Sequence, residues 1–167
     1  LIEGKIKRLE KGDVGNIIQR GGTILKTSRS QRFMTVEGRQ QAYETLLAND
    51  IDALVVIGGN GTLTGAAIFS EEFNIPIIGL PGTIDNDLSG TDYTIGFDTA
   101  INTAIEAVDK IRDTADSHNR LVFVEVMGRD SGYIDMYKGI GSGAGNVLVP
   151  EIDTNLEDLV TAMKLDA

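Results

Sequence analysis

The stretch ALVVIGGNGT, residues 53–62, decides the fold of this chain. Residues 53–57 are a short apolar run rich in β-branched side chains, and Gly58 and Gly59 close it, which predicts a buried strand. A helical pattern over 61–70 starts directly from the glycine loop. A strand that turns through glycines into a helix is the unit from which α/β folds with right-handed crossovers are built.

The same alternation continues on both sides of this stretch. Further strands are expected at 75–80, 121–127 and 147–149, and their nearly continuous apolar sequences are typical of parallel strands covered on both faces. Helices are expected at 36–48, 98–112, 131–142 and 154–164, with Asp98 as the N-cap of the second and a capping signature at the start of the last. The sequence therefore predicts a three-layer α/β/α fold with a mostly parallel sheet.

Composition restricts the classes of function. The 167 residues carry a formal net charge of −10, which disfavours nucleic acid and anionic membranes as partners, since both are polyanions. The chain has no cysteine and one histidine, which excludes disulfides, Cys-type zinc sites and multi-histidine metal sites. Its apolar runs are far shorter than the roughly 20 residues of a membrane span, and no signal-peptide pattern opens it, so we expect a cytoplasmic protein.

Three loops follow expected strands and should converge at one edge of the sheet. They are GGNGT at 58–62, PGTIDND at 81–87 and MGRDSG at 127–132. In open α/β sheets, ligands bind beyond the carboxyl ends of the strands. We therefore expect the functional site where these loops meet.

The glycine loop has two interpretations. Its backbone N–H groups, at the start of a helix, can bind an anion without any basic side chain. It is not a Walker A loop, because no Gly-Lys-Ser/Thr follows. The alternative is a tight strand-to-helix turn that needs glycine only for positive φ. The glycines alone leave both interpretations open.

The acidic loop has two interpretations as well. Asp85 and Asp87 flank Asn86, and Thr83 precedes them. Such side chains often bond their own backbone in an Asx turn, and for the loop taken alone this is the favoured interpretation. The functional alternative is that one carboxylate accepts a substrate hydroxyl proton while the other helps to hold a cation. An aspartate is a weak base at pH 7, which phosphoryl transfer tolerates because its catalysis is mainly positioning and charge stabilisation.

Arginines are the candidate phosphate ligands, because a guanidinium can pair with a phosphate through two parallel hydrogen bonds. Arg129 follows the expected strand 121–127 and is well placed for the site. Arg120 lies at the other end of that strand, so it reaches the site only if a neighbouring chain supplies the cleft. Arg29 lies in a polar loop and is undecided from the pattern, and His118 is interpreted as a structural loop histidine.

Taken together, these loops resemble the phosphofructokinase family. The resemblance is carried by GGNGTLTGA, PGTIDNDLSGTDYTIGFDTA and SHNRLVFVEVMGRDSGY, with RGGTILKTSR before them and VLVPE after them. It covers nearly the whole chain, and TIDND together with MGR is highly specific, whereas GGxGT alone is shared with NAD kinases and diacylglycerol kinases. It implies an ATP-dependent 6-phosphofructokinase that uses Mg²⁺ and phosphorylates fructose 6-phosphate in glycolysis.

The resemblance also implies roles for the matching residues. Asp85 would accept the proton of the fructose 6-phosphate 1-hydroxyl, and Arg29 would stabilise the charge on the transferring phosphoryl group. Thr83 would contact that group or the sugar phosphate. The implied catalytic set is Asp85, Arg29, Thr83 and Arg129.

Binding roles follow in the same way. The implied sugar-phosphate ligands are Thr83, Ile84, Asp85, Arg120, Met127, Gly128 and Arg129. The implied nucleotide ligands are Arg29, Ser30, Gly59, Asn60, Gly61 and Thr62, and the implied metal ligands are Asn60 and Asp87. Arg120 would reach the 6-phosphate across a subunit interface, which implies an oligomer, usually a homotetramer.

Two positions bear on the alternatives within the family. Pyrophosphate-dependent relatives typically carry Asp and Lys where this chain has Gly61 and Gly82, so ATP is the expected donor and pyrophosphate the alternative. Asn60 stands where the family usually has an aspartate associated with magnesium, and an amide is a neutral ligand that should bind a hard cation more weakly. This difference keeps open a catalytically weak regulatory subunit. An NAD-kinase-like enzyme is a further alternative, against which the MGR segment argues.

The limits of the chain suggest a piece of a larger protein. It opens with Leu1 rather than Met and stops at Ala167 within a helical pattern. We expect residues 1–167 to be the central part of an ATP-binding catalytic domain, without its N-terminal strand and without the second half of the enzyme.

Overall fold

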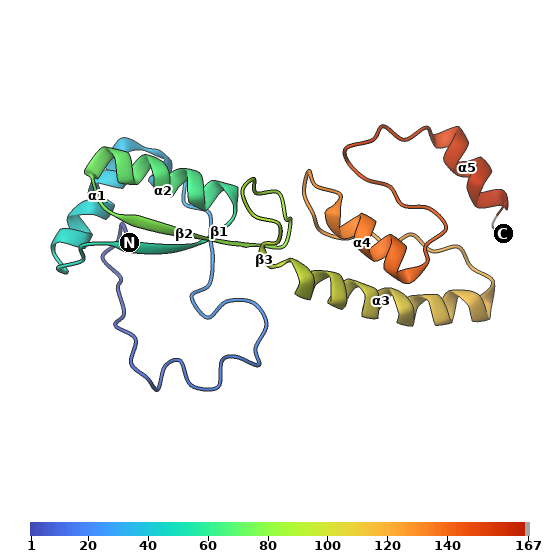
Figure 1. The fold of residues 1–167 in the computed structure, drawn as a ribbon, viewed down its shortest axis with the longest axis horizontal. Coiled ribbons are helices and arrows are strands. Elements are labelled where there is room, and N and C mark those ends of the chain that lie inside the picture. The colour runs from blue at the N-terminus through green and yellow to red at the C-terminus, as the bar shows by residue number, and fades with distance from the viewer. Residues whose placement is uncertain (166–167) are drawn as a thin grey trace. The chain divides into compact units, whose positions relative to one another are not determined.

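The computed structural model describes residues 1–165, and the chain divides into an N-terminal unit, Leu1–Leu80, and a C-terminal unit, Pro81–Ala167. Its described strands form a sheet with the order β1-β2-β3, so the fold is α/β as predicted. No described helix has the length and apolar character needed to cross a bilayer. The elements, in chain order, are η1 (Arg32–Met34), α1 (Val36–Leu47), β1 (Leu54–Gly58), α2 (Asn60–Phe73), β2 (Ile77–Thr83), β3 (Ile95–Gly96), α3 (Phe97–His118), α4 (Tyr133–Ser142) and α5 (Leu156–Leu165) (Figure 1).

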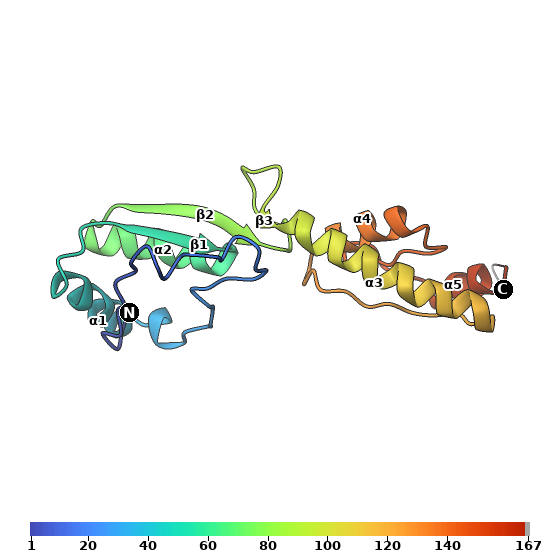
Figure 2. The same cartoon turned by 90° about the horizontal axis from the view of Figure 1, so that it is seen from below.

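The N-terminal unit packs helix α2 along one face of β1 and β2 (Figure 2). Its core is the fully buried Leu46 and Phe69 with Ala42 and Ile75, and the Phe33 ring lies 5.4 Å from that of Phe69. Helix α1 begins where the sequence predicts, because the Thr35 hydroxyl accepts a hydrogen bond from the Gly38 N–H at 3.1 Å. Strand β1 and helix α2 thus hold the two ends of the glycine loop 58–62 in place.

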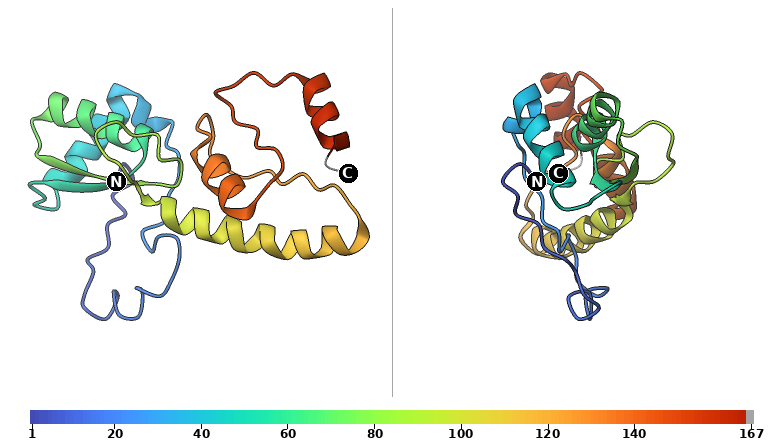
Figure 3. Two further views of the ribbon diagram at one scale, coloured as in Figure 1. Left: turned by 45° about the vertical axis from the view of Figure 1, so that its right-hand side comes forward. Right: turned by 90° about the vertical axis from the view of Figure 1, so that its left-hand side faces the viewer.

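The C-terminal unit packs α3 against α4, which lie side by side in Figures 1 and 3. Its core consists of Phe97, Ile101 and Ile134. The Phe97 ring meets the rings of Tyr133 and Tyr137 edge-on, with centroid distances of 6.2 and 5.5 Å, an arrangement that aromatic pairs favour. This packing supports the loops that precede both helices.

Strand β2 runs further than predicted. It continues through Pro81 and Gly82 to Thr83, so these residues are not a turn. Its last residues pair in parallel with the short strand β3, with Gly82 opposite Ile95 and Thr83 opposite Gly96, a strand that the sequence did not predict. Since β3 leads directly into α3, the N-cap of that helix is Gly96 rather than Asp98, which lies in the first turn.

Two predicted strands are wrong. Residues 121–127 and 147–149 lie outside any strand of the described chain, although their sequences are apolar. A strand needs a neighbour to satisfy its backbone N–H and C=O groups, and apolar sequence alone does not supply one. Leu121, Val122 and Phe123 remain 58%, 44% and 69% exposed. The last helix is also capped differently, since the Asn155 side chain accepts the Glu157 N–H at 2.9 Å.

Candidate active site

The acidic loop leaves the sheet at the end of β2. Thr83 is the last strand residue, and its hydroxyl accepts a hydrogen bond from the Asp85 N–H at 3.3 Å. Between them, the Ile84 side chain packs against the core of Phe97, Ile101 and Ile134. The contact of Ile84 with substrate stays a prediction, and its side chain anchors the loop. Thr83 and Asp85 are half-buried and held at their backbone.

Asn86 closes this loop through its side chain. Its Oδ1 accepts a hydrogen bond from the Thr94 N–H at 2.8 Å, and its Nδ2 donates to the Asp92 carbonyl at 3.2 Å. The sequence favoured an Asx turn for the isolated loop, and for Asn86 this interpretation is wrong, because its partners lie six and eight residues further on. The Asn86 backbone is left-handed, with φ of 51°, a conformation that asparagine tolerates better than most residues.

A second loop meets the acidic loop through Ser131. The Ser131 hydroxyl donates to the Asp85 carbonyl at 2.8 Å. Ser131 itself ends a tight turn, since its N–H donates to the Gly128 carbonyl at 3.0 Å. A Cβ at Gly128 would lie 2.5 Å from the Ser131 carbonyl oxygen, so the turn requires glycine there. Two of the three loops predicted to converge are therefore joined by a hydrogen bond within the C-terminal unit.

This turn also carries Met127 and Arg129, both of which are exposed. Arg129 has a left-handed backbone, with φ of 59°. Beyond the turn, the Glu151 carboxylate accepts the Gly132 N–H at 2.8 Å, next to the start of α4. Glu151 belongs to the VLVPE segment, so that segment fixes the end of the loop.

The glycine loop lies in the N-terminal unit. Gly59 is the N-cap of α2, and the Leu63 N–H donates to its carbonyl at 3.1 Å. The N–H groups of Asn60, Gly61 and Thr62 therefore fall in the first turn, where a helix provides no backbone acceptors. A Cβ at Gly58 would lie 2.5 Å from the Thr62 hydroxyl oxygen, whereas one at Gly61 would meet no atom within 4 Å. The loop offers backbone donors and open space, as an anion site requires.

The predicted nucleotide ligands Arg29 and Ser30 precede the short helix η1. Arg29 is exposed, and the Ser30 hydroxyl accepts the Phe33 N–H at 3.3 Å, so Ser30 uses its side chain to shape the turn.

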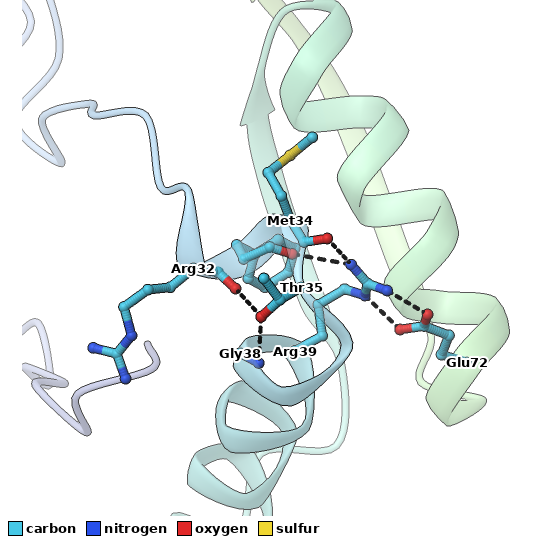
Figure 4. Close-up of polar contacts among 7 residues, drawn as sticks. Arg32, Met34, Thr35, Gly38, Arg39 and Glu72 are labelled. Atoms are coloured by element: carbon cyan, nitrogen blue, oxygen red, sulfur yellow. Dashed lines mark hydrogen bonds and ion pairs between the residues drawn. The ribbon is translucent and has the colours of Figure 1, made fainter.

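An ion pair between the buried Arg39 and the more exposed Glu72 supports that turn. Arg39 donates to both carboxylate oxygens of Glu72 at 2.6 and 2.7 Å, and to the carbonyls of Phe33 and Met34 at 3.1 and 3.0 Å (Figure 4). Hydrogen bonds from Arg39 lower the pKa of Glu72, and the same contacts raise that of Arg39. Sequence patterns gave no sign of this pair, because its partners are far apart in the chain.

Among the other predicted residues, Arg120 follows the C-terminus of α3 and has an exposed side chain, while its N–H donates to the Ala115 carbonyl at 3.0 Å. Asn60 lies in the first turn of α2, and Asp87 is half-buried in the acidic loop. Within residues 1–165 no three His, Cys, Asp or Glu side chains are grouped so that they could hold a metal ion alone.

Comparison with known proteins gives one consistent family. A family model described as phosphofructokinase matches residues 1–166. The chain is 58% identical to ATP-dependent 6-phosphofructokinase 2 of Bacteroides thetaiotaomicron over 164 residues. This match covers 98% of the present chain and 50% of the Bacteroides protein. It is 59% identical to ATP-dependent 6-phosphofructokinase 1 of Thermus thermophilus, in a match that covers 90% of this chain and 47% of the Thermus protein. The chain thus spans about half the length of these curated relatives.

The solved structures agree. The phosphofructokinase of Saccharomyces cerevisiae superposes with a TM-score of 0.87 at 38% identity, covering 96% of this chain and 25% of that one. The T-state phosphofructokinase of Pichia pastoris gives a TM-score of 0.76 at 35% identity, covering 92% and 18%.

Proposed function

This chain belongs to the phosphofructokinase family, and we propose that the whole protein transfers the γ-phosphoryl group of ATP to the 1-hydroxyl of fructose 6-phosphate. The products are fructose 1,6-bisphosphate and ADP, and the pathway is glycolysis. The observation that carries this proposal is the Ser131–Asp85 hydrogen bond of 2.8 Å. It joins the loop of the proposed base to the loop of the proposed sugar-phosphate ligands Met127, Gly128 and Arg129.

We assign one step of this reaction to Asp85. The 1-hydroxyl oxygen attacks the γ-phosphorus, and its new bond forms as the bond from that phosphorus to the bridging oxygen of ADP breaks, leaving the electron pair on ADP. The hydroxyl proton passes to the Asp85 carboxylate. Arg29, Arg129 and the Thr83 hydroxyl stabilise charge on the transferring group and orient it, which is where most of the rate enhancement in phosphoryl transfer arises.

The donor phosphates are assigned to the glycine loop. The N–H groups of Gly61 and Thr62 lie in the first turn of α2, where the helix dipole favours an anion. A Cβ at Gly61 would meet no atom within 4 Å, so the space beside this residue is open. Glycine at this position supports ATP as the donor.

Magnesium is the proposed cofactor, with Asp87 and the amide oxygen of Asn60 as its protein ligands. The chemistry of these donors fits, because Mg²⁺ is commonly held by one or two carboxylates together with substrate phosphates. When bound, Mg²⁺ supplies positive charge that offsets the charge of the phosphates.

We further propose a homotetramer in the cytoplasm, in which Arg120 binds the 6-phosphate of a sugar in a neighbouring subunit. The position of Arg120 beyond the C-terminus of α3 supports this assignment, since it lies at the far end of the segment that leads to Arg129.

The test uses the full-length protein with fructose 6-phosphate and magnesium, and compares ATP with pyrophosphate. Turnover with ATP alone, lowered by about 10²–10⁴-fold in Asp85→Ala, is the expected result. Turnover with pyrophosphate alone would overturn the choice of donor. Binding of sugar phosphate without turnover from either donor would instead identify a regulatory subunit.

A further inference from the structure

We propose that Asn86 is a positioning residue, which fixes the backbone between Asp85 and Asp87 and thereby places the Asp85 carboxylate for proton transfer. This inference rests on the proposed function, because it assigns Asn86 a part in the same reaction. Asn86 itself is not assigned a contact with substrate, and it acts through its two neighbours.

The backbone of Asn86 makes the first part of the case. Its φ of 51° lies in the left-handed region, which side chains other than asparagine, aspartate and glycine rarely adopt. Asp85 and Asp87 are the residues immediately before and after Asn86. A change in the Asn86 backbone therefore changes the directions of both carboxylates relative to each other.

The side chain of Asn86 makes the second part. The loop that contains it leaves the sheet at Thr83 and returns at Ile95, and strand pairing fixes both ends. Inside the loop, Asn86 supplies the acceptor for the Thr94 N–H and a donor to the Asp92 carbonyl. Thr94 is 5% exposed, and a buried N–H requires a partner. The Asn86 side chain thus joins residue 86 to Asp92 and Thr94 and acts as an internal brace, which helps to keep the loop in one conformation.

The Asp85 peptide groups are braced separately. Thr83 accepts the Asp85 N–H, and Ser131 donates to the Asp85 carbonyl. These two contacts fix the peptide groups on either side of Asp85, and Asn86 fixes the chain that follows them. Together, the three side chains hold the loop through backbone atoms.

Positioning matters here because the proposed base is weak. A general base must lie within about 2.6–3.2 Å of the proton donor, and a displacement of about 1 Å can reduce the rate by roughly 10²-fold. Loss of the Asn86 brace should therefore lower kcat, while the substrate-binding groups outside the loop keep the KM values close to normal.

The experiment measures kcat and KM of the full-length protein carrying Asn86→Gly, which keeps the left-handed backbone and removes both side-chain hydrogen bonds. We expect kcat to fall by about 10²-fold, with both KM values within about threefold of the wild type. The matched control is Asn74→Gly at the C-terminus of α2, where an exposed asparagine has the same left-handed backbone, with φ of 50°. Its kcat should stay within about twofold of the wild type.

A double-mutant cycle separates positioning from a purely structural role. In an Asp85→Ala background, Asn86→Gly should cost less than about twofold further, because the base that it positions is gone. An equal loss with and without Asp85 would overturn the proposal, as would wild-type kcat in Asn86→Gly.

Two further controls complete the test. If Asn86→Gly does not fold, Asn86→Ser replaces it, since serine is neutral and too short to make both hydrogen bonds, and wild-type kcat in it would overturn the proposal. A wild-type protein without ATP-dependent turnover would refute the proposed function. An active wild type with an unaffected Asn86→Gly variant would refute only the role of Asn86.

Discussion

Replacing Gly61 with aspartate should leave the fold intact and damage only the use of ATP. Gly61 is the second residue of α2, and a Cβ there meets no atom within 4 Å. Gly58 in the same loop lacks this freedom, because its Cβ would lie 2.5 Å from the Thr62 hydroxyl oxygen. A carboxylate in the first turn of a helix interacts favourably with the helix dipole, by about 0.3–1 kcal/mol. We therefore expect Gly61→Asp to unfold at or slightly above the wild-type temperature.

The effect on ATP follows from charge. If the donor phosphates lie against the N–H groups of Gly61 and Thr62, an aspartate at position 61 lies about 5 Å from a phosphate oxygen. Two like unit charges at that distance repel by about 3 kcal/mol at an effective dielectric constant near 20. This repulsion corresponds to an increase of about 10²-fold in the KM for ATP.

The assay is steady-state kinetics of the full-length protein with ATP varied at saturating fructose 6-phosphate, together with thermal unfolding. Gly61→Asn is the matched control, since asparagine has the shape of aspartate without its charge. We expect the asparagine variant to show a much smaller increase in KM than the aspartate variant. Equal KM values in the two variants would refute the argument from charge, and an unchanged KM in Gly61→Asp would refute the location of the phosphates.

Two further predictions concern the contacts around the site. Ser131→Ala removes the hydrogen bond to the Asp85 carbonyl, so the free energy of unfolding in a denaturant titration should fall by about 1 kcal/mol and kcat should fall with it; unchanged kcat would contradict the role of the contact. Glu72→Gln tests the ion pair with Arg39. Because the pKa of Glu72 is lowered in the folded state, its stabilising contribution is present above about pH 4.3 and is lost as the pH falls through the folded pKa. Between pH 5 and 3, thermal unfolding of the wild type should therefore shift more steeply than that of Glu72→Gln, and parallel curves would contradict the prediction.

Local patterns predicted the elements that depend on local interactions. Helix α1 was expected at 36–48 and spans Val36–Leu47, because its apolar spacing and the Thr35 cap are both properties of neighbouring residues. Helix α3 was expected to end at Arg112 but continues to His118, since no glycine or proline interrupts it before the left-handed Asn119. Strands depend on distant partners, which explains why 121–127 was wrongly predicted and the two-residue β3 was missed.

The reactive residues of the site stay predictions from the sequence, whereas the residues that support them were found only in the structure. Asp85, Asp87 and Arg129 could be selected because the loops that carry them match the motifs of the family that the sequence resembles. Asn86 and Ser131 could not be selected in the same way, because asparagine and serine are common in turns and usually bond their own neighbours. Their observed partners lie up to 46 residues away, and the register of β2 with β3 brings the Asn86 partners within reach.

The residue types in and around the acidic loop fit the distinction between reactive and supporting residues. Thr83, Asn86 and Ser131 all hold the loop by bonding backbone atoms through neutral side chains. Neutral side chains suit this task, because a bracing carboxylate would add repulsion beside Asp85 and Asp87 and beside incoming phosphates. Asn86 and Ser131 therefore hold the loop without an assigned contact with substrate, whereas Thr83 both accepts the Asp85 N–H and is assigned to the reaction. It follows that substitutions of Asn86 and Ser131 should change kcat through geometry, whereas substitutions of the aspartates should change it through chemistry.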